Sequence, residues 1–227
     1  TDNQHSRASL GHRLFGFLCD DVIVPFMEVM KSEVGNPDLI FDGRDAWASP
    51  PMISLDMMDE YVVAYTRRLR DKLGDKVTTR GNWGDAKSRD VERFFLQKLR
   101  CSPGALSVLD PDLYDVGPER VKAFAEKHNA FVTAGVDAIL LQRGPVETVV
   151  QRIQLYIDKL ARDQRCMLHL NQIPARTPPE HVHAAVEACH AYGRHPIPDH
   201  LDDIHFELPE RESFDAFMQE KGEQVLP

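Results

Sequence analysis

The feature that most constrains this chain is the alternation of short apolar segments with longer amphipathic helical segments. Each apolar segment is bounded by turn residues, which is typical of a strand buried on both faces. The expected strands cover residues 38–42, 77–79, 105–109, 130–133 and 166–170. Because each is followed by helical periodicity, the expected outcome is parallel strands joined by helical crossovers.

The number of these units sets the predicted architecture. The crossover helices are expected at residues 53–73, 88–99, 118–128, 145–160 and 178–192. A closed barrel of eight strand–helix units typically needs about 250 residues, so five units cannot close one. The sequence therefore predicts an α/β fold: a partial TIM-type (β/α) barrel of about five parallel strand–helix units, with an open sheet as the alternative.

The N-terminal region precedes the first unit and has a different pattern. Apolar residues recur at spacings of mostly three and four between Leu10 and Val34, which predicts an amphipathic helix. Pro25 predicts a kink or break inside it, and Gly35 predicts its end. We expect three parts: an N-terminal helix over 1–35, the barrel portion over 36–196, and a C-terminal tail over 197–227 with a short helix near 213–221.

Composition narrows the classes of function. The 227 residues carry a net charge of −9 without a basic stripe, which argues against nucleic-acid binding. No apolar run approaches the roughly 20 residues that span a bilayer. The 4 cysteines are widely spaced with no C-x-x-C pair, which predicts reduced thiols, a cytoplasmic location and no cysteine-rich zinc site.

Candidate site residues follow from position, because ligands of parallel α/β folds gather at the carboxyl ends of the strands. The side chains just after the expected strands are Asp42, Arg44, Asp45 and Trp47; Arg80, Asn82 and Trp83; Asp110 and Asp112; Asp137; and His169 and Asn171. Structural alternatives are open: the aspartates as turn or capping residues, the tryptophans as covers, and His169 as a core histidine. Arg80 favours a ligand more strongly, since a near-buried guanidinium needs an acidic partner or an anion.

Several of these segments resemble one family. The segment Phe41–Pro50 reads FDGRDAWASP and precedes a helix that carries Tyr61 and Tyr65. Further matching segments are Leu109–Asp110, Ala134–Val149, and Ile173–Gly193 with its TPPEH motif. Together they resemble the uroporphyrinogen decarboxylase superfamily, which includes corrinoid-linked methyltransferases, over about residues 36–196. The resemblance implies the C-terminal part of that family's barrel.

Departures from the family pattern indicate which branch of the superfamily the sequence resembles. Ala46 stands where decarboxylases usually carry Ser, and Asn171 stands where they place His. The segment Gly81–Gly84 supplies neither the imidazole nor the thiolate of the zinc-dependent methyltransferases, so no zinc or other metal site is expected. The resemblance thus implies a methyltransferase or O-demethylase that moves a methyl group between a small substrate and a corrinoid held by a partner protein.

Each candidate residue has an expected role, and two other functions stay open. Asp45, His169 and Asp110 are the expected catalytic residues, with general-acid help to a departing oxygen assigned to Asp45 or His169. Arg80 would orient an anionic group of the substrate. The other residues expected to bind substrate are Asp42, Arg44, Trp47, Asn82, Trp83, Asp137 and Asn171. The alternatives are uroporphyrinogen decarboxylation and a non-catalytic subunit, and an incomplete barrel predicts an oligomer completed by a second chain or a second copy.

Overall fold

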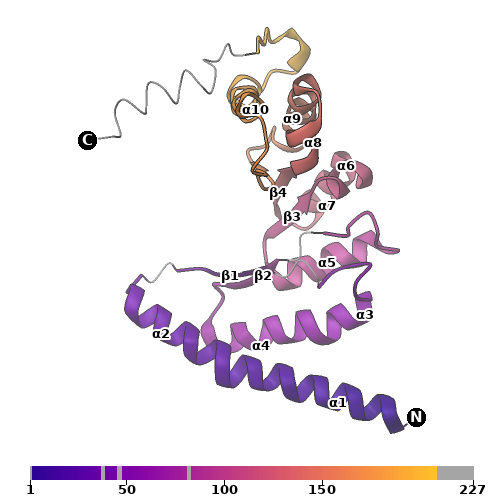
Figure 1. Ribbon diagram of the computed structural model, residues 1–227, viewed down its shortest axis with the longest axis vertical. Coiled ribbons are helices and arrows are strands. Elements are labelled where there is room, and N and C mark those ends of the chain that lie inside the picture. The colour runs from indigo at the N-terminus through magenta and orange to yellow at the C-terminus, as the bar shows by residue number, and fades with distance from the viewer. Residues whose placement is uncertain (1, 37–38, 45–47, 81–82, 209–227) are drawn as a thin grey trace. The chain divides into compact units, whose positions relative to one another are not determined.

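The computed structural model describes residues 2–36, 39–44, 48–80 and 83–208 (Figure 1). The chain divides into two compact units, residues 1–133 and residues 134–227, and the division falls within one strand. Each unit has its own helices and its own buried side chains. We therefore describe the units one at a time.

The first unit begins with a long helical segment and continues with alternating strands and helices. Its helical elements are α1 (Asp2–Phe17), the π-helix η1 (Leu18–Ile23), α2 (Val24–Val34), α3 (Leu55–Met57), the π-helix η2 (Met58–Val63), α4 (Ala64–Leu73), α5 (Val91–Cys101), α6 (Asp112–Val116) and α7 (Pro118–Lys127). Its strands are β1 (Phe41–Arg44), β2 (Val77–Arg80) and β3 (Ala105–Leu109), followed by the start of β4 (Phe131–Val136).

The second unit begins within β4. It continues through α8 (Ala138–Arg143), α9 (Val146–Leu160), β5 (Cys166–Leu170), α10 (Pro179–Tyr192) and the 3-10 helix η3 (Leu201–Asp203). Ile153, Tyr156 and Leu160 of α9 are fully buried, as is Ala188 of α10, and the two helices pack together. The small alanine side chains of α10 allow this close approach.

The described residues confirm a mixed α/β fold with parallel strands. β1 pairs with β2 in parallel, with Phe41 opposite Val77 and Arg44 opposite Arg80. The other sheet has the strand order β3–β4–β5 and is also parallel. The expected single series of five strands is thus divided into a two-stranded and a three-stranded sheet within the described residues. The helix α5, which connects β2 to β3, packs on both strands.

The long N-terminal helix continues past its proline. The expected break at Pro25 is wrong, because α1, η1 and α2 follow one another without a gap (Figure 1). Pro25 lies just after the π-helix η1, so its missing N–H falls where the hydrogen-bond pattern changes from π-helical to α-helical. The π-helical turn directly before it accommodates the change in hydrogen bonding. Gly35 ends α2 with φ +60°, as predicted.

Side chains on one side of this helix pack into the hydrophobic core beside the sheet of β1 and β2. Cys19 and Val24 are buried against Leu69 and Leu73 of α4 and against Val77 of β2. Phe15 adds ring contacts with Tyr61 and Tyr65. These contacts fix the N-terminal helix to α4 and to the strand that α4 precedes.

Local details differ from a simple alternation of one strand and one helix. The short helix α6 lies between β3 and the crossover helix α7, since the chain becomes helical at Asp112. The helix expected over residues 53–73 contains the π-helix η2 between α3 and α4. The short helix expected near 213–221 lies outside the described residues. In the part of the chain that the structure describes, no helix combines the length and apolarity needed to cross a bilayer.

Candidate functional site

The carboxyl ends of β2 and β3 hold a group of buried acidic side chains. Asp110 directly follows β3 and is almost completely buried. Asp112, at the start of α6, accepts hydrogen bonds from the backbone N–H of Gly84 at 2.7 Å and of Ala86 at 3.1 Å. Asp112 therefore joins the segment after β2 to the helix after β3, where parallel α/β folds place their ligands.

Gly84 fits this arrangement because it has no side chain. Its φ is +85°, and a Cβ atom built there would lie 1.7 Å from the carbonyl oxygen of Pro50. Any other residue would clash with the backbone and would also be strained by the positive φ. The segment after β2 is thus pressed against the Ser49–Pro50 backbone, and this contact sets its path over the buried carboxylates.

A buried ion pair lies beneath this segment. The Nζ atom of Lys98, on α5, is 2.6 Å from Oδ1 of Asp85 and donates to its Oδ2 at 2.7 Å. The two side chains are 4% and 0% exposed, respectively. Lys98 also donates to the carbonyl oxygen of Ser107 in β3 at 2.9 Å. A charged pair removed from water in this way holds only when both partners are present and hydrogen-bonded.

Burial has the largest effect on the pKa of the Asp85 carboxyl. It raises the pKa of this carboxyl above its ordinary value, the Lys98 ammonium opposes that shift, and the neighbouring Asp112 adds to it. A carboxyl with a raised pKa retains its proton to a higher pH than a solvated one.

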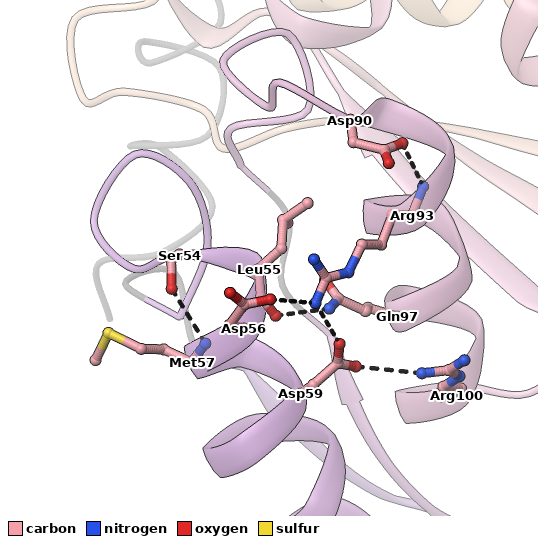
Figure 2. A network of polar contacts seen from close by, with 9 residues as sticks. All are labelled: Ser54, Leu55, Asp56, Met57, Asp59, Asp90, Arg93, Gln97 and Arg100. Atoms are coloured by element: carbon pink, nitrogen blue, oxygen red, sulfur yellow. Dashed lines mark hydrogen bonds and ion pairs between the residues drawn. The ribbon is translucent and has the colours of Figure 1, made fainter.

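Polar contacts with α3 and η2 fix the position of α5, which carries Lys98 (Figure 2). Arg93 donates to Asp56 at 2.6 Å and to Asp59 at 2.8 Å. The buried Gln97 donates to the carbonyl oxygen of Leu55 at 2.7 Å. Partial burial acts to raise the pKa of Asp59, but hydrogen bonds from Arg93 and Gln97 outweigh it, and the pKa lies below its usual value.

Other side chains predicted for the site lie at the ends of β1 and β2 in the same unit. Arg44 and Arg80 are the last residues of the two strands and are partners in register. Asp42 is exposed and accepts a hydrogen bond from the hydroxyl of Thr78 at 2.9 Å. Trp83 is half-buried. Predicted residues Asp45, Trp47 and Asn82, and the side chains of Arg44 and Arg80, lie outside the described residues.

The remaining predicted residues lie at the ends of β4 and β5 in the second unit. The backbone N–H of Asn171 donates to the carbonyl oxygen of Val136 at 3.1 Å, which places Asn171 beside the strand end that precedes Asp137. Asp137 caps α8 by accepting from the N–H of Ile139 at 2.8 Å. Asn171 is buried and His169, on β5, is half-buried. The convergence of both groups on one common edge stays a prediction.

Asp85 and Lys98 were not among the predicted site residues. The sequence carries one signal for Lys98, which shares a helical face with Phe94 and Cys101 at spacings of four and three. A lysine in an apolar face indicates either a side chain that reaches solvent or a buried ion pair. Asp85 carries no comparable signal, because an aspartate in a polar loop is ordinary.

Comparison of the chain with models of known protein families, with curated proteins and with solved structures found no match. No family is thereby shown. The resemblance to the uroporphyrinogen decarboxylase superfamily stays a prediction carried by the motifs alone. The described residues also contain no group of three or more His, Cys, Asp or Glu side chains placed to hold a metal ion.

Proposed function

We propose that this protein moves a methyl group between a small methoxylated or methylated substrate and a corrinoid carried by a partner protein. The observation that carries the proposal is the buried carboxylate group of Asp85, Asp110 and Asp112, which follow β2 and β3, strands of the two different sheets. The motif resemblance gives the reaction class. In this proposal the strand–helix units are a portion of a (β/α) barrel, and the carboxyl ends of their strands face the substrate.

Removal of a methyl group from oxygen requires an acid, because the oxygen that loses the methyl group must take a proton. Asp110 follows β3 at the position the resemblance assigns to the acidic end of a barrel strand, and we assign this proton transfer to it. Asp85 and Lys98 hold the surrounding segments in place. His169, on β5, and Asp45, which lies outside the described residues, remain the other two expected acids.

In this proposal the protein binds the methyl donor and the corrinoid is held by its partner. A reduced corrinoid supplies the nucleophile that accepts a methyl group. The chain's own contribution is to bind the donor, to exclude water from the buried carboxylates and to deliver a proton.

The proposal is tested with the purified protein, cob(I)alamin and a panel of methoxylated and methylated small molecules. The corrinoid absorption spectrum should change with at least one donor, and Asp110→Asn should slow that change by roughly 10²- to 10⁴-fold, the usual range for loss of an acid. Asp71→Asn, at an exposed position on α4, is the matched control and should keep the wild-type rate. No change with any donor would contradict the proposal.

The decarboxylase alternative has its own readout in the same experiment. Uroporphyrinogen offered to the protein should remain unchanged if the chain is a methyltransferase. Appearance of coproporphyrin fluorescence after oxidation would favour decarboxylation instead. Absence of both activities would favour the non-catalytic subunit.

A further inference from the structure

An exposed apolar stripe runs along the outer side of the N-terminal helix of the first unit. Its six side chains are between 45% and 64% exposed. They are Leu10, Leu14, Phe17, Val22, Phe26 and Val29. Scattered single apolar residues are ordinary at a surface, but a contiguous stripe of this length marks an interaction site.

The spacing of the stripe shows that it lies on one face. Leu10, Leu14 and Phe17 follow the pattern i, i+4, i+7, and the triplet from Val22 to Val29 repeats that pattern. The step from Phe17 to Val22 is one residue too long for a continuous α-helical face. The π-helix η1 (Leu18–Ile23) lies across that step, and its i→i+5 turn absorbs the additional residue. Without it, the second triplet would turn about 100° further around the helix axis.

The opposite face of the helix is already occupied by the unit's own core. Cys19 and Val24 are buried, and Ile23 and Met27 pack partly buried against the same cluster. Phe15 contacts the tyrosine rings of η2 and α4. The helix is therefore apolar on two faces, and the stripe is the one that the unit leaves uncovered.

We propose that the stripe pairs with the stripe of a second copy of this chain, antiparallel about a two-fold axis. At these exposed fractions the six side chains expose roughly 600 Å² of surface. With the partly exposed Leu18, Met30 and Val34 at its borders, the surface reaches about 800 Å², which matches the roughly 800 Å² per partner of a standard interface.

The stripe is also complementary to itself, which favours a second copy over an unrelated partner. The two triplets have the same spacing, so an antiparallel copy places Leu14 opposite Phe26 and Phe17 opposite Val22. A two-fold axis makes each of these contacts twice.

Analytical ultracentrifugation of the full chain from about 1 µM to about 100 µM tests this pairing. The wild type should show a concentration-dependent monomer–dimer equilibrium. Phe26→Glu should weaken dimerisation at least about 100-fold, because a symmetric interface contains the change twice and a central aromatic commonly accounts for tenfold or more. Ile139→Glu, an equally exposed apolar position in the second unit, is the matched control and should leave the dissociation constant unchanged.

A charge change on another side of the same helix tests the face. Glu28→Arg, an exposed position on the far side of the helix from Phe26, should leave the dissociation constant unchanged. Circular dichroism checks that every variant keeps its helix content. A monomer at all concentrations, a Phe26→Glu dimer as stable as the wild type, or a Glu28→Arg dimer as weak as Phe26→Glu would overturn the proposal.

Discussion

Replacing Lys98 by Met should cause one of the largest single-residue losses of stability in this protein. The change removes the ammonium from Asp85, which is 0% exposed and has its carboxylate oxygens 2.6 and 2.7 Å from Nζ. Breaking a buried pair by removing one partner costs about 3–5 kcal/mol. The carbonyl oxygen of Ser107 loses a charged donor as well. We expect a decrease of about 4 kcal/mol in the free energy of unfolding, out of a typical total of about 5–15 kcal/mol.

The loss of stability in Lys98→Met should depend on pH. Without Lys98, the pKa of the buried Asp85 rises further above its unfolded value, because burial is no longer opposed by the ammonium. A carboxyl with a raised folded-state pKa binds more protons when folded, so stability falls as pH rises from the unfolded pKa toward the folded one. Lys98→Met should therefore be less destabilised at pH 5 than at pH 8.

Urea unfolding followed by circular dichroism measures these effects. With a typical slope of about 2 kcal/mol per molar, the midpoint of Lys98→Met should fall by about 2 M. The double variant Asp85→Leu/Lys98→Met should recover most of that loss, since an apolar pair can replace a buried ion pair. Lys72→Met is the control, because Lys72 pairs with Asp20 at 3.0 Å near the surface and should lose less than about 1 kcal/mol. Equal losses for both lysine variants, or additive effects in the double variant, would refute a buried, coupled pair.

Three further predictions concern packing, the network around α5, and acid stability. Gly84→Ala should lower the unfolding free energy by about 3 kcal/mol or more, because its Cβ would meet the Pro50 carbonyl at 1.7 Å and its φ is +85°; thermal unfolding measures this. Arg93→Ala should cost about 1–2 kcal/mol, since it releases Asp56 and Asp59 together; urea unfolding measures this. Stability should fall as pH drops from about 4 toward 2, because hydrogen bonds that outweigh partial burial hold the pKa of Asp59 below its usual value. Asp59 stabilises the fold only while it is ionised, so its contribution is lost as it takes up a proton. Unfolding midpoints measured across that pH range test this.

Each of these predictions has a control within the chain. Gly16→Ala is the control for Gly84→Ala, since a Cβ at Gly16 meets nothing within 4 Å, and equal effects would contradict the steric argument. Arg67→Ala, on exposed α4 surface, is the control for Arg93→Ala. Asp59→Asn should flatten the acid limb of the stability curve, and an unchanged limb would remove Asp59 from the explanation.

Some strands were predictable from sequence because their signal is local, whereas the first strand, expected over residues 38–42, lies at Phe41–Arg44. Apolar runs bounded by turn residues placed the strands at Ala105–Leu109 and Cys166–Leu170 where the structure has them. The π-helix η1 was not predicted, although the five-residue step from Phe17 to Val22 is its signature. Spacings of mostly three and four describe an α-helix well enough that one longer step is easily missed.

The site was predictable only in part, because its contacts join distant segments. Asp110 and Asp112 followed from their position after a strand. The ion pair between Asp85 and Lys98 depends on how α5 packs against β3, which no local pattern specifies. The close approach of Gly84 to Pro50 likewise joins segments more than thirty residues apart.

The central claim is methyl transfer at the carboxylates after β3, and an isotope measurement tests it most directly. The protein is incubated with a reduced corrinoid and a donor that carries a deuterated methyl group, and the corrinoid is analysed by mass spectrometry. We predict that the deuterated methyl group appears on the corrinoid with wild type and Asp71→Asn, and at least about 100-fold more slowly with folded Asp110→Asn. Absence of label with every donor, or equal labelling by Asp110→Asn, would contradict the account.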